Sequence, residues 1–205
     1  MTIIVALHDP FAGTWIGADS RMIVGQGYVM PAEVRKWVRV GGGVVGVAGS
    51  ARTATLVRQF ASVLGTMAET PENLAEAMRL LFDTKGYRIL PDEGKSGPGH
   101  CGSDILYATP DGVWDIGWNF AVVRVRDGCL WARGSGMDHA LGADYALCRD
   151  KRRRGLYPEQ RIEAALDAAA HFDAACAGPM LIERIEDGAE TDHGSDEAMD
   201  RAVNG

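Results

Sequence analysis

The chain has 205 residues, of which 46% are hydrophobic and 24% charged, and a formal net charge of −7. This length can bury the core of one domain, and the composition is that of a folded globular protein. The negative charge argues against a nucleic-acid partner held by a basic face, and no apolar run reaches the roughly 18–20 residues of a membrane span.

The sequence predicts a block of strands followed by a block of helices, and then the same order again. In the first half, apolar and alternating runs predict strands at 3–7, 14–18, 35–40 and 44–48, with a hairpin loop at 8–13. Helical spacing over 54–64 predicts one amphipathic helix. Thr70, followed by Pro71 and Glu72, has the chemistry of a helix start, and that second helix should run to about Phe82.

The second half repeats this order after a Gly- and Pro-rich loop at 91–100. Strands are predicted at 104–107, 113–116, 121–125 and 130–133, with Asp-Gly turns at 111–112 and 127–128. One helix should contain 140–147, another should begin after Pro158, and a last strand is expected at 179–182. The acidic segment 186–205 is short of apolar residues, so we expect it to be disordered.

Strand blocks separated from helix blocks predict an α+β protein with two antiparallel sheets face to face and helices outside, a four-layer αββα sandwich. Residues 1–185 should form this single domain. The basic run 151–154 precedes Gly155 and is typical of a solvated helix end. The scattered cysteines and histidines have no ligand spacing, so we expect reduced thiols, no metal and no cofactor. No signal peptide is evident, and we expect a cytoplasmic location.

The chemistry of the chain centres on Thr2. Removal of Met1, which normally occurs before a small side chain, would leave a hydroxyl and a free α-amine on one residue. The amine has an unperturbed pKa of about 7.7–8.0 and can therefore act as a general base near neutral pH. An exposed strand end is the alternative reading of Thr2 when that residue is considered by itself.

Four other short segments, considered together with Thr2, match the motifs of a known family. They are 17–21 (GADSR), 34–37 (VRKW), 47–50 (VAGS) and 134–136 (GSG). At these residues the sequence resembles the proteasome β-subunit family, which includes the bacterial HslV-type peptidases, within the N-terminal-nucleophile (Ntn) hydrolases. The resemblance extends from Thr2 to about Ile182, although the spacings from Thr2 to Asp19 and from Asp19 to Lys36 are slightly longer than in the family.

The resemblance implies a role for each matching residue. Thr2 would be the nucleophile, Lys36 would lie beside it, and Asp19 would pair with Lys36. The Gly49 N–H would stabilise the oxyanion, and Ser135 would orient the amine. Asp173 is matched to the Asp of the family's penultimate helix region, where the family's following Ser-Gly reads Cys176-Ala177 here. The residues expected to line an apolar specificity pocket are Met22, Val34, Val47 and Ala51.

The family implies a threonine peptidase that cleaves peptides or unfolded proteins inside a ring of identical subunits, with an ATPase unfoldase as a candidate partner that feeds it. Two alternatives stay open. The chain could be an Ntn amidohydrolase that cleaves one small amide, or a catalytically inactive assembly subunit that keeps Met1.

Overall fold

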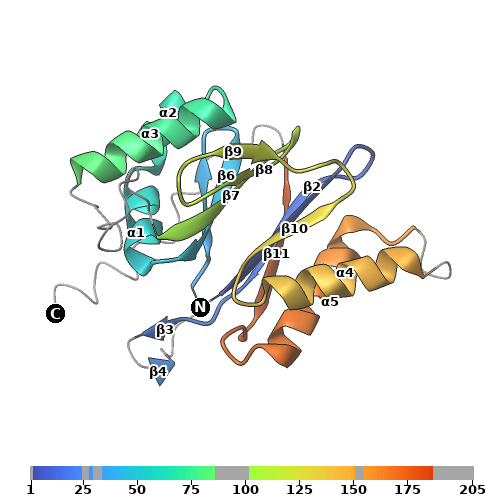
Figure 1. Ribbon diagram of the computed structural model, residues 1–205. Helices are drawn as coiled ribbons and strands as arrows, with labels where there is room; N and C mark the ends of the chain where they lie inside the picture. The colour runs from blue at the N-terminus through green and yellow to red at the C-terminus, as the bar shows by residue number, and fades with distance from the viewer. Residues whose placement is uncertain (1, 25–27, 30–33, 86–101, 151–154, 187–205) are drawn as a thin grey trace.

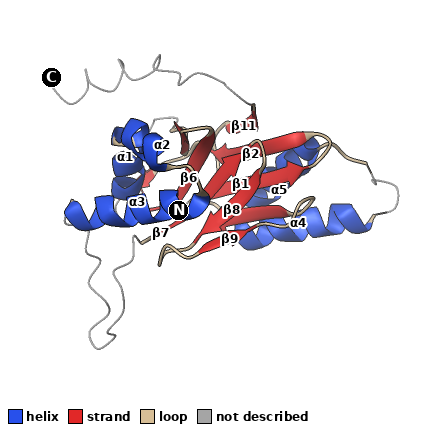
Figure 2. Ribbon diagram, turned by 90° about the horizontal axis from the view of Figure 1, so that it is seen from above, coloured by secondary structure: helices blue, strands red, loops and turns tan. Residues whose placement is uncertain are grey.

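A computed structural model describes residues 2–24, 28–29, 34–85, 102–150 and 155–186. Two antiparallel sheets pack face to face, and helices cover the outer face of each (Figure 1; Figure 2). The predicted α+β, four-layer αββα sandwich is therefore confirmed.

The first sheet has four strands in the order β10-β1-β2-β11, and all neighbours are antiparallel. Its central strand is β1, whose backbone pairs with β10 on one side and β2 on the other. The strands are β1 (Ile3–Asp9), β2 (Gly13–Asp19), β10 (Leu130–Gly134) and β11 (Met180–Ile185).

The second sheet has five antiparallel strands in the order β5-β6-β7-β8-β9. They are β5 (Trp37–Val40), β6 (Gly43–Gly49), β7 (Ser103–Thr109), β8 (Gly112–Ile116) and β9 (Val122–Arg124). A two-stranded pair that the sequence did not predict, β3 (Ile23–Val24) with β4 (Tyr28–Val29), projects from the body of the molecule (Figure 1).

Three helices cover the five-stranded sheet and two cover the four-stranded sheet. They are α1 (Ala51–Gln59), α2 (Ala61–Met67), α3 (Pro71–Thr84), α4 (Met137–Arg149) and α5 (Pro158–Phe172). The start of α3 is as predicted, because the Thr70 side chain accepts a hydrogen bond from the Asn73 N–H at 3.1 Å.

The single helix predicted over 54–64 is wrong, because the chain forms α1 and α2 with a break at Phe60. The Phe60 backbone leaves the helical region (φ −109°, ψ 15°). The break redirects α2 onto the β5–β6 turn, where a Cβ added at Gly65 would lie 2.7 Å from the Gly41 nitrogen. Neither Pro nor Gly marks Phe60, so local sequence carried no signal of the break.

Every other predicted strand and helix is present, with ends that differ by a few residues. Residues 35 and 36 precede β5, and Pro179 precedes β11. The loop predicted at 91–100, the basic run 151–154 and nearly all of the tail predicted over 186–205 lie outside the described residues. Among those that are described, no helix is long and apolar enough to cross a membrane.

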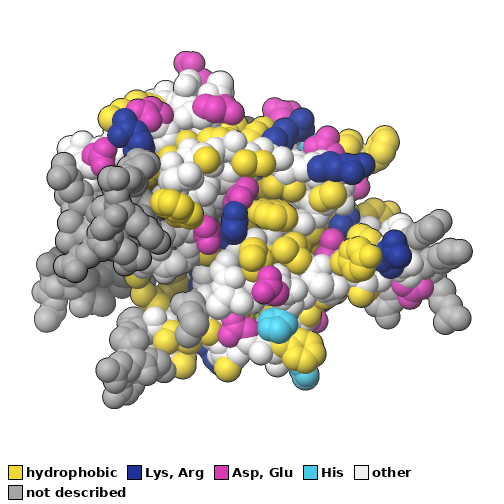
Figure 3. All heavy atoms as spheres, in the orientation of Figure 1, with side chains coloured by type: hydrophobic (Ala, Val, Ile, Leu, Met, Phe, Trp, Pro, Cys, Tyr) yellow, Lys and Arg dark blue, Asp and Glu magenta, His cyan; other side chains and the backbone are white. Residues whose placement is uncertain are grey.

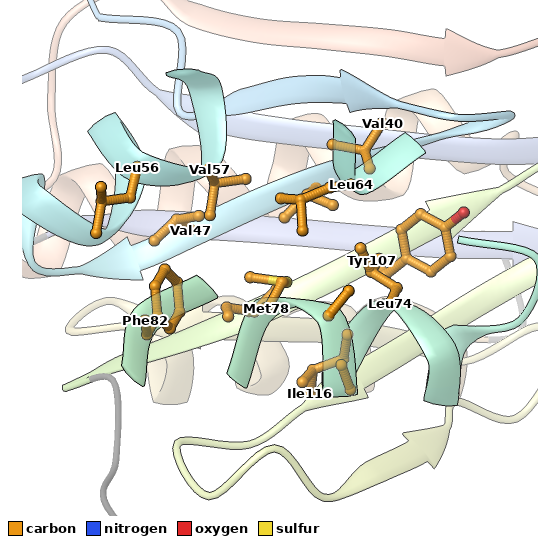
Figure 4. Close-up of a cluster of buried hydrophobic side chains, with 14 residues drawn as sticks. Val40, Val47, Leu56, Val57, Leu64, Leu74, Met78, Phe82, Tyr107 and Ile116 are labelled. Atoms are coloured by element: carbon orange, nitrogen blue, oxygen red, sulfur yellow. The ribbon is translucent and has the colours of Figure 1, made fainter. Parts of the chain in front are cut away.

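The core has three apolar layers. One lies between the five-stranded sheet and α1–α3 and includes Leu74, Met78 and Phe82 (Figure 4). A second lies between the four-stranded sheet and α4–α5, and a third, which includes Ile4 and Leu106, lies between the two sheets. Each fully buried large side chain contributes about 1.5–3 kcal/mol. The sheets, and the residues at their ends, are therefore held in a packed frame.

Charged side chains on the surface are mixed in sign. On the face shown in Figure 3, Lys and Arg of the described residues lie among Asp and Glu and among apolar side chains. The described residues on that face form no extended basic surface.

Candidate active site

Asp19 is the centre of a buried polar cluster at the start of β1. Its side chain is fully buried at the end of β2. One carboxylate oxygen, Oδ1, accepts hydrogen bonds from the Thr2 hydroxyl at 2.8 Å, the Ile3 N–H at 2.9 Å and Lys36 Nζ at 2.6 Å. The pairing of β1 with β2 sets Ile4 opposite Ala18, and this register brings Thr2 alongside Asp19.

Lys36 reaches this cluster from the other sheet. Its backbone carbonyl accepts a hydrogen bond from the Val47 N–H at 3.0 Å, which continues the pairing of β5 with β6. The side chain is only 9% exposed. Burial lowers the pKa of the Lys36 ammonium, and its hydrogen bond to Asp19 and the Asp19 charge oppose that shift. Lys36 is thus a desolvated ammonium group held by one carboxylate.

Gly134 and Ser135 lie against the backbone of Thr2. Gly134 has φ +110°, and a Cβ there would lie 2.0 Å from the Thr2 carbonyl oxygen, so the position requires glycine. Ser135 Oγ is 3.5 Å from the same oxygen, longer than an ordinary hydrogen bond. The pairing of Ile3 with Gly134 places both residues there.

Asp173 and Cys176 complete the side of the cluster that holds Ser135. Asp173 caps α5, and its carboxylate accepts hydrogen bonds from the Ala175 N–H at 2.9 Å and from Cys176 Sγ at 3.3 Å. A hydrogen bond from Ser135 lowers the pKa of Asp173. Burial raises the pKa of the Cys176 thiol to about 12, so the sulfur stays protonated. Cys176 Sγ is 3.8 Å from Ser135 Oγ.

Gly49 ends β6 in the other sheet. Its φ is +133°, and a Cβ there would lie 2.8 Å from both the Gly102 carbonyl oxygen and Ser103 Oγ, so this position also requires glycine. The Ser50 N–H donates to Ser103 Oγ at 2.9 Å and fixes the turn from β6 into α1.

The structure therefore brings Thr2, Asp19 and Lys36 into direct contact. Ser135 and Asp173 form a second group against the Thr2 backbone, while Gly49 is positioned at a strand end of the facing sheet. Two of the residues expected to line a specificity pocket differ in their surroundings. Val47 packs in the core beneath the helices, whereas Ala51 is exposed at the start of α1.

Three contributors were given no role from the sequence. The Ala177 N–H approaches the second oxygen of Asp19 at 3.4 Å, and Ser103 supports the turn at Gly49. Cys176 and Ala177 were identified only as departures from a family motif. A backbone amide carries no sequence signal, and Ser103 follows a loop whose length the sequence does not fix.

The cluster suits the activation of a hydroxyl group. A buried carboxylate holds the Thr2 hydroxyl and a desolvated ammonium within a few ångströms of each other, and hydroxyl nucleophiles are activated in such surroundings. In the part of the chain that the structure describes, no group of three or more His, Cys, Asp or Glu side chains could hold a metal ion.

Comparisons with known proteins place the fold. No protein-family model matches the sequence, and no curated protein is significantly similar to it. Among solved structures, the chain is similar to Thiobacillus denitrificans BPH (22% identity, TM-score 0.68, 91% of this chain and 99% of that one). It is also similar to the same protein in complex with Epoxomicin (22%, 0.67, 91% and 100%) and to a eukaryotic HslV from Trypanosoma brucei (19%, 0.68, 89% and 98%). The HslV-type fold expected from the sequence motifs is thus confirmed.

Proposed function

We propose that this chain is a proteasome-like threonine peptidase whose nucleophile is Thr2, exposed by removal of Met1. The observation that carries the proposal is the convergence of the Thr2 hydroxyl and the Lys36 ammonium on one buried oxygen of Asp19. The HslV-type fold supports it, as does the Epoxomicin complex of the similar Thiobacillus protein.

The first step is attack by Thr2. Its Oγ forms a bond to the carbonyl carbon of the scissile peptide while its own α-amine takes the hydroxyl proton. The positive charge of Lys36 stabilises the developing alkoxide, and Asp19 holds Lys36 in place. Burial makes this electrostatic effect larger than it would be in water.

The tetrahedral intermediate carries its negative charge on the former carbonyl oxygen. The Gly49 N–H is the proposed donor to this oxyanion, and losing such a donor typically costs about 2.7–4 kcal/mol of barrier height. When the carbon–nitrogen bond breaks, the leaving amine takes the proton from the Thr2 ammonium. A water molecule then hydrolyses the acyl ester on Thr2, and the amine again accepts and returns the proton.

Ser135, Asp173 and Cys176 hold the other side of the nucleophile. Ser135 lies beside the Thr2 backbone and hydrogen-bonds to Asp173, whose carboxylate also accepts the Cys176 thiol. In the processed chain this group would orient the amine of Thr2, with Asp173 stabilising its protonated form.

The substrate and the assembly follow from the same family resemblance. We propose that the protein cleaves peptides or unfolded chains, with an apolar side chain seated near Met22, Val34 and Ala51. A cytoplasmic ring of identical subunits would enclose the sites, and an ATPase unfoldase could deliver substrates to it.

Mass analysis and labelling test the proposal together. The native protein should lack Met1, hydrolyse fluorogenic peptides and gain the mass of one epoxomicin molecule on Thr2. The variant Thr2→Ala should lose both turnover and labelling while it keeps its fold and assembly. The control Thr55→Ala removes an exposed hydroxyl on α1 that donates only to Ala51 O, and it should stay fully active.

Other outcomes favour the other functions. Hydrolysis of a single small amide with no cleavage across a peptide library would indicate an amidohydrolase. Retention of Met1 on the native protein, with no labelling, would indicate an inactive assembly subunit. Full activity of Thr2→Ala would refute the assignment of the nucleophile.

A further inference from the structure

Arg133 and Asp115 form an ion pair that connects the two sheets. Arg133 Nε donates to Asp115 Oδ1 at 2.7 Å, and a second guanidinium nitrogen donates to the other carboxylate oxygen. Arg133 lies on β10 of the four-stranded sheet and Asp115 on β8 of the five-stranded sheet. Both side chains are mostly buried, 21% and 12% exposed. A two-pronged contact of this kind fixes distance and orientation together.

The pair lies near the candidate site on both sheets. Arg133 lies two residues before Ser135 in the chain. In the sheet it is paired with Ile4, which lies two residues after Thr2. Hydrogen bonding to Asp115 raises the pKa of Arg133, and the charge of nearby Asp104 adds to this effect. Asp104 is opposite Ala48, the residue before Gly49. The ion pair thus lies beside β1, which directly follows Thr2, and close to β6, which ends at Gly49.

The proposed reaction depends on the spacing of the two sheets at this end. Thr2 belongs to one sheet and the oxyanion donor Gly49 to the other, so the distance between nucleophile and donor is a distance between layers. A displacement of about 1 Å in such a geometry can lower a rate about a hundredfold. Apolar packing holds the two sheets together but is non-directional, and a directional ion pair near this end adds a constraint on their separation there.

We infer that Arg133 and Asp115 are positioning residues, which hold the sheets at the separation that Thr2 and Gly49 need to act on one carbonyl group. This inference rests on the proposed function. Neither residue touches the reacting atoms, and both act through the strands that carry Thr2 and Gly49.

The opposite edge of the sandwich provides a matched control. There Glu183 on β11 accepts hydrogen bonds from Trp37 Nε1 at 3.1 Å and from the Arg39 guanidinium, both on β5. This contact also joins the two sheets through partly buried charges. Glu183 is opposite Ile16, three residues along β2 from Asp19, and so lies farther from the Thr2 end of the sandwich than Arg133. It also lies 3.9 Å from the guanidinium of Arg35, the residue before Lys36.

The experiment compares Asp115→Asn with Glu183→Gln in the full chain. Each variant removes one carboxylate charge and keeps the side-chain shape. We expect Asp115→Asn to lower kcat at least about tenfold, to change KM less than about threefold and to slow epoxomicin labelling in proportion. Glu183→Gln should keep kcat within about twofold at a similar loss of Tm. The conservative Arg133→Lys should fall between wild type and Asp115→Asn.

Hydrogen exchange separates this inference from the proposed function. Asp115→Asn should speed amide exchange in 3–7 and 46–49, and Glu183→Gln should not. If the wild-type protein neither turns over peptides nor reacts with epoxomicin, the proposed function fails, and exchange alone decides whether the pair holds the sheets at this end. Unchanged exchange, equal loss of kcat in both variants, or full kcat in Asp115→Asn would overturn the inference.

Discussion

Lys36 and Asp19 meet across the two sheets, with Lys36 Nζ 2.6 Å from Asp19 Oδ1, and both side chains are almost completely removed from solvent. Burying two charges is costly, and their attraction offsets this cost only in good geometry. Here the carboxylate oxygen also receives the Thr2 hydroxyl and the Ile3 N–H. The pair therefore ties the start of β1 to the facing sheet.

Removing the cation should destabilise the protein. Lys36→Met leaves a buried carboxylate without its counter-charge, and we expect the free energy of unfolding to fall by about 3 kcal/mol. Peptide hydrolysis should also be lost. Asp19→Asn in the Lys36→Met background should recover part of the stability, because the amide carries no charge. Urea denaturation of the single and double variants measures the coupling; strictly additive losses would contradict a direct pairing.

Gly134 should tolerate no side chain. In Gly134→Ala the new Cβ would overlap the Thr2 carbonyl oxygen, so β1 and β10 must separate locally. Gly128→Ala is the control, because Gly128 also has positive φ (+76°) but nothing within 4 Å of its Cβ position. We expect about 1–2 kcal/mol for the control and clearly more for Gly134→Ala, measured by denaturant unfolding. Equal losses would show that the clash is relieved without cost.

The Cys176 thiol should resist alkylation at pH 8 while exposed Cys129 reacts, because Cys176 is buried and its pKa is raised to about 12. Mass spectrometry after iodoacetamide treatment, with and without denaturant, distinguishes the two thiols. Rapid modification of Cys176 in the folded protein would contradict its burial.

Stability should also depend on pH through the same thiol. In the unfolded chain the thiol ionises with its ordinary pKa of 9.0, but in the folded protein it stays protonated to about pH 12. The unfolded state therefore binds fewer protons in this interval, so the free energy of unfolding should fall with rising pH, by up to about 1.4 kcal/mol per pH unit. Below this interval the thiol should contribute no slope. Cys176→Ser should abolish this component, and parallel curves for both proteins would rule it out.

The cap of α3 gives a prediction far from the site. Thr70→Val keeps the side-chain shape but removes the oxygen that accepts the Asn73 N–H. We expect a loss of about 1 kcal/mol in the free energy of unfolding with unchanged peptide hydrolysis. Thermal unfolding and a turnover assay check both parts, and a loss of activity would indicate that α3 is coupled to the site.

The architecture could be predicted from the sequence because apolar residues recur with the spacing typical of a strand or of a helix. Short runs rich in Val and Ile, such as 3–7 and 44–48, indicated strands, and Thr70-Pro71 marked a helix start. The break at Phe60 was missed because it depends on the contact of Gly65 with Gly41, which lie far apart in the chain. Contacts of this kind override local propensity.

The candidate site could be predicted only in part from the sequence. The family resemblance pointed to Thr2, Asp19 and Lys36, which lie before the first predicted strand, after the second and at the start of the third. Their shared oxygen, the thiol contact of Cys176 with Asp173 and the Arg133–Asp115 pair depend on register and on how one sheet lies over the other. Those quantities follow from the packed core and not from any short motif.

The close approach of Gly134 to Thr2 has a consequence for motion. Thr2 directly precedes the regular ladder of a sheet, because β1 is paired on one flank from Ile3 and on the other from Ile4. In the proposed reaction the Thr2 backbone would therefore have little room to move toward the scissile carbonyl group. Any adjustment between the protein and a bound molecule must therefore come from the molecule, or from segments outside the ladder such as the turn after Gly49.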